Sequence, residues 1–100
     1  IIVGGENVHP QSVTEVLEAM PGIDEVHAGG VEDSETFSRI AVWAVPTADA
    51  AGRELTADAI RAWVHDKLAE HSVPRDVHFL SKLPRNATGK VVPRLLKHGD

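Results

Sequence analysis

The sequence lacks cysteine altogether, which excludes disulfide bonds, thiolate catalysis and zinc sites built on Cys ligands. Long apolar runs are missing too, because the longest, Ile40 to Pro46, is far shorter than the roughly 20 residues that cross a bilayer. We therefore expect no membrane span. No basic leader or small-residue cleavage site marks a signal peptide, so we expect a cytoplasmic protein.

Positive charge is scarce, with 10 Lys and Arg against 15 Asp and Glu and a formal net charge of −5. This balance argues against a nucleic-acid binder and against a polybasic membrane anchor. The charge is unevenly distributed, however. Residues 75–97 hold six basic side chains and one acidic one, a net charge of +5, and the remaining residues carry −10. The basic end predicts a local anionic partner.

What is present suits one α+β domain. A length of 100 residues with 42% apolar side chains is ordinary for a single globular domain. The chain does not start with Met, and Ile1 to Val3 reads as the end of a strand broken by glycines. We expect residues 1–100 to be a single domain from a longer protein.

Periodicity predicts the first helix and a hairpin after it. Four apolar residues at i, i+3, i+4 and i+7 form one helical stripe: Val13, Val16, Leu17 and Met20. The helix starts at Pro10 or at a capping box of Ser12 and Glu15. Two strands follow, Ile23 to Val31 and Phe37 to Val45, and Gly29-Gly30 in the first indicates a bulge or a close backbone approach. The second strand is apolar without alternation, which predicts cover on both faces.

The second half predicts a further helix, a strand and a short basic helix. Residues 46–55 read as a loop, and Thr56 caps a helix that extends to about His71. A short strand around residues 77–80 and a terminal helix from Pro93 to Lys97 complete the order β-α-β-β-α-β-α. The fold expected is a small sheet with a three-stranded core, a central antiparallel hairpin and about three packed helices.

The loop before the predicted terminal helix is the first candidate site. Gly89 allows a tight turn, and Lys90 places a mobile ammonium beside it, which suits a phosphate or carboxylate. A P-loop is excluded, because Pro84 stands where its first glycine should be and Val91 follows the lysine. From Gly-Lys alone, an ordinary solvated lysine in a surface loop is the favoured explanation.

The second candidate is the Gly4-Gly5 turn between a strand and a helix, where free N–H groups or a close backbone approach could serve a ligand. A plain turn is the alternative. No metal site is predicted, because His65 and His71 lie on different faces of one helix. Trp43 and Trp63 lie within apolar runs and are predicted to be core residues.

Taken together, these loops resemble a known family. The segment Gly4 to Pro10 resembles the stretch just after the hinge in the adenylate-forming acyl-CoA synthetases, a superfamily that includes luciferases and peptide-synthetase adenylation domains. Residues 73–79 and 83–91 resemble the end of that family's C-terminal domain. The end of the family's first helix is matched by Pro21 to Ile23, and its acidic hairpin turn by Val31 to Asp33. The resemblance therefore covers nearly all of the chain.

The resemblance implies a two-step reaction. A carboxylic acid attacks ATP to give acyl-AMP, and coenzyme A then displaces AMP; Mg²⁺ is held mainly by the N-terminal adenylation domain, the partner of this chain. The resemblance implies that this domain is a mobile C-terminal lid. Lys90 would be the catalytic lysine that binds the ATP and AMP phosphate, and Gly4 and Gly5 would line the pantetheine path. The sequence Gly-Gly-Glu-Asn at residues 4–7 resembles the fatty-acid–CoA ligase branch most.

Several residues depart from the family pattern, and two other functions remain open. Ser12 and Thr14 stand where the family often has glutamates. Glu32 replaces a common proline, and Ser38 replaces a common glycine. Pro93 interrupts the basic run that usually follows the lysine. The alternative enzyme is an adenylation domain that loads a carrier-protein thiol. The alternative from another class is a non-catalytic module that binds an anion with its basic end.

Overall fold

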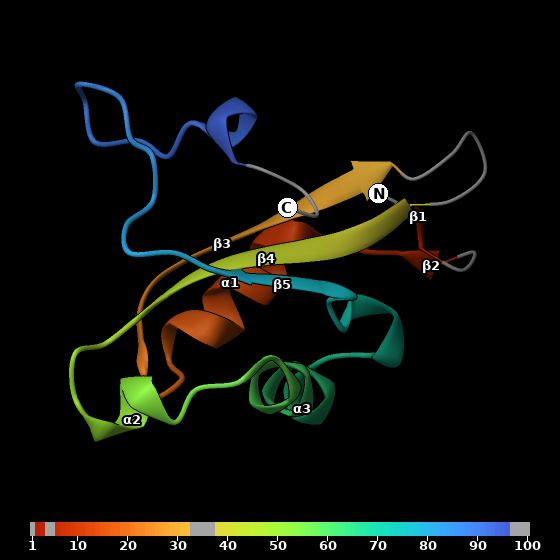
Figure 1. The fold of residues 1–100 in the computed structure, drawn as a ribbon. Coiled ribbons are helices and arrows are strands. Elements are labelled where there is room, and N and C mark those ends of the chain that lie inside the picture. Colours follow the sequence, from red (N-terminus) through yellow and green to blue (C-terminus); the bar gives the residue numbers. More distant parts are fainter. Residues whose placement is uncertain (1, 4–5, 33–37, 97–100) are drawn as a thin grey trace.

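A three-stranded sheet separates helices on one face from the C-terminal segment on the other (Figure 1). The computed structural model describes residues 2–3, 6–32 and 38–96. Its elements in chain order are β1 (Ile2–Val3), β2 (Glu6–Asn7), α1 (Pro10–Glu18), β3 (Ile23–Glu32), β4 (Ser38–Pro46), α2 (Ala50–Arg53), α3 (Ala57–Lys67), a 3-10 turn (Glu70–Ser72), β5 (Asp76–Phe79) and a second 3-10 turn (Pro93–Leu95).

The strand order is β3-β4-β5, with β4 in the centre. β3 and β4 form the predicted antiparallel hairpin, in which Val26 pairs with Ala44. β5 pairs with β4 in parallel, with Val42 opposite Val77. A parallel neighbour requires a crossover connection, and α3 supplies it. The α+β class and the three-stranded core are therefore confirmed.

β4 is covered on both faces, as its continuous apolar run predicted. Its residues Ile40, Val42 and Ala44 belong to a core cluster with residues of α1 and α3, which include Leu17 and Val64. The alternating residues face the opposite way and form a second cluster with two residues of the C-terminal segment: Ala41, Trp43, Val45, Leu83 and Leu96. The segment after β5, residues 80–96, is thus a packed layer of the molecule, and it is called the C-terminal layer below.

The N-terminal region contains one strand more than expected. β1 and β2 pair as a small antiparallel hairpin, with Ile2 opposite Asn7. α1 begins at Pro10, and its N-cap residue makes no side-chain cap bond, so the capping-box alternative at Ser12 is wrong. Proline suits this first position because the N–H that it lacks would have no helical partner. Thr14 accepts a bond from the Ala28 N–H at 3.0 Å, which ties α1 to β3.

Two predictions about strand and loop are corrected. The irregularity in β3 lies between Ile23 and Glu25, where Asp24 is the extra residue, and Gly29-Gly30 keeps regular pairing. The predicted loop 46–55 contains α2, because the Asp49 carboxylate accepts the Gly52 N–H at 3.1 Å and caps a single turn.

Two predicted helices are shorter than expected. α3 ends at Lys67 rather than near His71, because Leu68 turns to an extended conformation and packs against the first core cluster. The predicted helix Pro93 to Lys97 is only a 3-10 turn, Pro93–Leu95, after which Leu96 is extended and buried in the second cluster. Burial of one side chain on the sheet thus decides where each helix stops.

Candidate functional site

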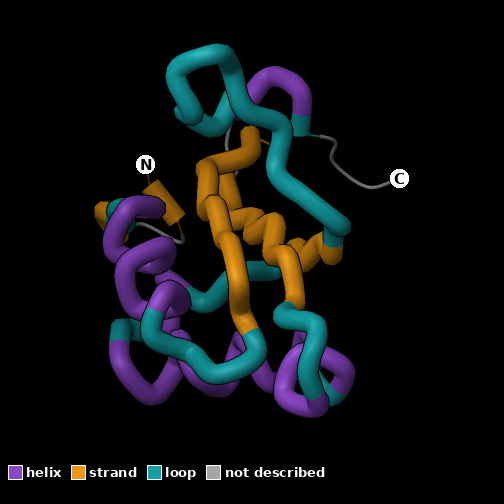
Figure 2. The backbone as a smooth tube through the Cα atoms, turned by 90° about the vertical axis from the view of Figure 1, so that its left-hand side faces the viewer, coloured by secondary structure: helices purple, strands orange, loops and turns teal. Residues whose placement is uncertain are grey.

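Lys90 lies on a narrow hairpin of residues 84–92 that projects from the C-terminal layer. An antiparallel bridge joins Arg85 to Val91, and the Asn86 N–H donates to the Lys90 carbonyl at 2.9 Å. Figures 1 and 2 both show this hairpin at the end of the molecule away from the three α-helices. The predicted loop is therefore an ordered turn rather than an open connection.

The turn is organised by Asn86 and Gly89. The Asn86 Oδ1 accepts three bonds, from the Thr88 N–H at 3.0 Å, the Thr88 hydroxyl at 2.7 Å and the Lys90 N–H at 3.0 Å. The Gly89 N–H donates to the Asn86 carbonyl at 3.0 Å. Gly89 has φ +86°, in the left-handed region that favours glycine. The predicted glycine turn is thus confirmed, and Asn86 is an additional organiser.

Arg85 ties the hairpin to the sheet. Its Nε and Nη2 donate to the Glu25 carboxylate of β3 at 3.0 and 2.5 Å. Its Nη1 donates to the Gly89 carbonyl at 2.8 Å. Sequence reasoning missed both residues of this ion pair. Glu25 and Arg85 stand 60 positions apart, so no local spacing could reveal the pair, whereas Asn-x-Thr was a readable turn signal at Asn86.

The Lys90 side chain is exposed, and within the described ranges it makes no ion pair. A hydrated ammonium on a fixed backbone can approach a phosphate or carboxylate oxygen that accumulates negative charge. It can therefore act on a ligand presented from outside this domain. The basic character of residues 75–97 is only partly compensated here: Glu25 of β3 pairs with Arg85, and Asp76, the one acidic residue of the segment, pairs with Arg39 of β4.

Gly4 and Gly5, the second candidate site, lie outside the described residues. Their flanking strands β1 and β2 are described, and Figure 1 shows this hairpin at the opposite end of the molecule from residues 84–92. The role of Gly4 and Gly5 toward a ligand stays a prediction.

The remaining predicted residues are structural. Trp43 is only 2% exposed and is a core residue as predicted. Trp63 is only partly buried: it packs against the first core cluster, and its Nε1 donates to the Val16 carbonyl at 2.6 Å. His27 lies beside Trp43, with ring centroids 6.1 Å apart, and its burial lowers its pKa. Within residues 2–3, 6–32 and 38–96, no three His, Asp or Glu side chains are grouped to hold a metal ion. None of the helices in these ranges has the length and apolar character needed to cross a membrane.

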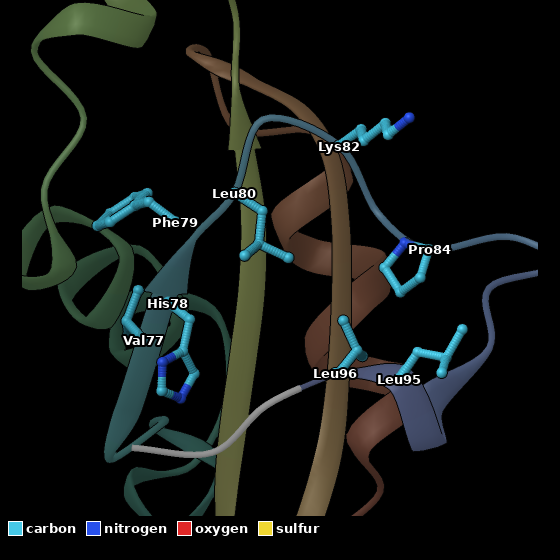
Figure 3. A pocket seen from close by; sticks show the side chains of 8 residues that line it. All are labelled: Val77, His78, Phe79, Leu80, Lys82, Pro84, Leu95 and Leu96. Atoms are coloured by element: carbon cyan, nitrogen blue, oxygen red, sulfur yellow. The ribbon is translucent and has the colours of Figure 1, made fainter. Parts of the chain in front are cut away.

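A groove of about 610 Å³ lies between β5 and the C-terminal layer, separate from Lys90. Figure 3 shows its lining residues: Val77, His78, Phe79, Leu80, Lys82, Pro84, Leu95 and Leu96. Two of them are exposed apolar side chains, Phe79 at 42% and Leu95 at 55%. β5 has no second strand partner among the described residues, so this edge of the sheet borders the groove.

Comparison with known proteins identifies similar domains in ligases. Residues 12–90 match the family described as AMP-binding enzyme C-terminal domain. A 2-succinylbenzoate–CoA ligase of Geobacillus kaustophilus is 38% identical over 97 residues, which are 97% of this chain and 19% of that protein. A long-chain-fatty-acid–CoA ligase of Mycobacterium tuberculosis is 36% identical over 97 residues, 97% of this chain and 18% of that protein. The chain thus spans about a fifth of the length of these relatives.

Solved structures agree in fold. A Mycobacterium tuberculosis fatty acyl CoA synthetase superposes with a TM-score of 0.82 at 32% identity, covering 95% of this chain and 18% of that one. The o-succinylbenzoate CoA synthetase of Bacillus subtilis, solved with its acyl-adenylate intermediate, gives a TM-score of 0.80 at 28% identity. That match covers 99% of this chain and 19% of the synthetase.

Proposed function

Because the chain belongs to the family of AMP-binding enzyme C-terminal domains, we propose that it is the mobile C-terminal lid of an acyl-CoA synthetase. The complete enzyme joins a carboxylic acid to AMP from ATP, releases pyrophosphate, and then transfers the acyl group to the thiol of coenzyme A. Two CoA ligases among the relatives support the reaction class. The observation that carries the role of this domain is Lys90, an exposed ammonium on an ordered hairpin.

Lys90 acts in the first step. When the carboxylate oxygen attacks the α-phosphorus, a new O–P bond forms and pyrophosphate leaves, while negative charge spreads over the α-phosphate oxygens. An ammonium placed between the carboxylate and these oxygens stabilises that charge more strongly than the charge of the separated substrates. Loss of one such contact costs about 3 kcal/mol of barrier, roughly a hundredfold in rate.

Gly4 and Gly5 act in the second step, where the thiol of the pantetheine arm attacks the acyl carbon and AMP leaves. Backbone without Cβ atoms permits a close approach of the arm. The β1–β2 hairpin and the Lys90 hairpin lie at opposite ends of the fold, which supports a lid that rotates between the two steps. ATP, the acyl pocket and Mg²⁺ belong mainly to the N-terminal adenylation domain in this proposal.

The acyl substrate is proposed to be a fatty acid. The similarity to fatty acyl ligases supports this choice. An aromatic acid is the competing substrate class, because the 2-succinylbenzoate ligase is 38% identical to this chain and the long-chain-fatty-acid ligase 36%. A carrier-protein thiol as acceptor is the alternative for the second step. Pyrophosphate release by the full-length enzyme with a panel of fatty and aromatic acids distinguishes the acids, and thioester analysis with coenzyme A and with a carrier protein distinguishes the acceptors.

Lys90→Ala in the full-length enzyme tests the role of the lysine. We expect acyl-AMP formation to fall by about a hundredfold, with thioester formation from supplied acyl-AMP nearly unchanged. Lys82→Ala, which removes an exposed lysine from the same segment, serves as the matched control and should leave both half-reactions intact. Equal loss of both half-reactions in Lys90→Ala, or no loss in either, would contradict the proposal.

A further inference from the structure

We propose that Arg85 and Glu25 are positioning residues that fix the orientation of the Lys90 hairpin for adenylate formation. The inference rests on the proposed function of Lys90 and adds a cause for its placement. Arg85 bonds to both the sheet and the turn: it contacts the Glu25 carboxylate through two nitrogens and the Gly89 carbonyl through a third. Gly89 directly precedes Lys90 in the chain.

Apolar contact holds the base of this hairpin, where half-buried Val91 packs against the second core cluster, so polar contacts must orient its exposed tip. Every residue from Arg85 to Lys90 is exposed, and Leu83, at 4% exposure, is the last buried residue before the tip. Bonds within the turn, such as those to Asn86 Oδ1, fix its internal shape and not its direction. The direction relative to the sheet is set at Arg85, since Glu25 belongs to β3 and is itself half-buried.

The chemistry of arginine fits this function better than lysine would. A guanidinium presents its donors in a rigid planar fork, so the bonds to Glu25 constrain the direction of the bond to Gly89. A lysine at position 85 would keep the charge and lose that fork. Because the pair is partly exposed, with side-chain exposures of 41% for Arg85 and 27% for Glu25, its contribution to global stability is small. Variants of either residue should therefore fold, and their defects should be confined to the loop.

The kinetic test uses the full-length enzyme with Glu25→Gln and Arg85→Lys, each alone and combined with Lys90→Ala. We expect each single variant to slow acyl-AMP formation about tenfold at saturating ATP and carboxylate, because a small displacement of a reacting group lowers kcat strongly. Thioester formation from supplied acyl-AMP should stay at the wild-type rate. In the Lys90→Ala background neither substitution should slow acyl-AMP formation further, since both act through the missing lysine.

The structural readout is hydrogen exchange in the same full-length proteins. We expect the peptide that spans residues 84–92 to exchange faster in Glu25→Gln and Arg85→Lys, with peptides from α1 and β4 unchanged. Asp66→Asn, which removes a carboxylate from the exposed Lys67 ion pair on α3, is the control for Glu25→Gln. Arg75→Gln removes an exposed charge from the same basic segment and is the control for Arg85. Both controls should behave as wild type.

The outcomes separate the two proposals. Unchanged exchange at residues 84–92, wild-type adenylation in Glu25→Gln and Arg85→Lys, or a full additional loss in the Lys90→Ala background would overturn the positioning by Arg85 and Glu25 while leaving Lys90 its function. Wild-type adenylation in Lys90→Ala would refute the function of Lys90, and the positioning inference would fall with it.

Discussion

At the scale of single residues, the candidate site depends on one backbone conformation at Gly89. Its φ of +86° lies in the left-handed region, and a Cβ built there would meet nothing within 4 Å. The cost of Gly89→Ala is therefore backbone strain alone, about 1 kcal/mol. We expect this strain to shift the turn and to slow acyl-AMP formation several-fold in the full-length enzyme, whereas Gly89→Asn should be closer to wild type because Asn tolerates this region. Equal rates for Ala and Gly at position 89 would contradict this account.

Asn86 supports the same turn by hydrogen bonding. Asn86→Ala removes the acceptor for the Thr88 N–H, the Thr88 hydroxyl and the Lys90 N–H. Because an Asp side chain keeps an oxygen acceptor at this position, we expect Asn86→Asp to preserve the turn and Asn86→Ala to loosen it. The comparison is made by hydrogen exchange at residues 84–92. A loop that exchanges equally slowly in both variants would show that the side-chain acceptor is not required.

At this scale, contacts between residues close together in the sequence could be predicted, and contacts between distant residues could not. The Gly89 turn and Lys90 are neighbours, so a short motif contains both, and so does the Asn86 turn signal. The contact between Arg85 and Glu25 forms only after β3 and the C-terminal layer have come together, so no local pattern encodes it. The conformation at Gly4 and Gly5 lies outside the described residues, and their function stays a prediction.

At the scale of elements, α3 tests how a single cap supports a helix. The Thr56 hydroxyl accepts the Ala59 N–H at 3.1 Å, as the sequence predicted for an N-cap. Thr56→Ala should lower the free energy of unfolding by about 1 kcal/mol, and Thr56→Ser should retain most of it, because Ser offers the same acceptor. Urea denaturation of residues 1–100 measures both. A loss of the same size in Thr56→Ser would point to the threonine methyl group instead of the cap.

Helices and strands were predictable where an apolar stripe on one helix face, or one continuous apolar run, defines the element. The stripe of α1 and the continuous apolar run of β4 are visible in the sequence and proved correct. The parallel pairing of β5 and the short 3-10 turn at Pro93 were not, because each depends on a partner surface across the sheet. A helix start at Pro10 and one at Ser12 look equally good locally, and the structure begins the helix at Pro10 with no side-chain cap bond.

At the scale of the whole molecule, the C-terminal layer should contribute to stability as well as carry the site. Leu83 is 4% exposed against Trp43 and Leu96, whereas Leu95, on the same layer, is 55% exposed. Leu83→Ala should lower the free energy of unfolding by about 2–5 kcal/mol, the usual cost of a truncated core leucine. Leu95→Ala, the matched control, should stay within about 0.5 kcal/mol. Equal, small effects in urea denaturation would mean that this layer is not packed.

The same packing makes stability depend on pH through His27. Burial lowers the pKa of this imidazole below its usual value of 6.5, so the unfolded chain takes up a proton at a higher pH than the folded one. The contribution of His27 is therefore fully present above pH 6.5 and is lost as the pH falls toward the lowered pKa of the folded state. Asp49, whose pKa is lowered by bonds from Thr47 and Gly52, acts in the same direction only near and below its usual value of 3.8.

Urea denaturation at pH 7.5, 6.5 and 5.5 excludes a contribution of Asp49, because these values lie well above the range in which Asp49 is protonated, and comparison with His27→Gln assigns the effect to His27. We expect the free energy of unfolding to decrease across the three values in the wild-type chain and to decrease less in His27→Gln, which cannot take up a proton. If the free energy of unfolding changes with pH equally in His27→Gln and in wild type, burial beside Trp43 does not lower the pKa of His27.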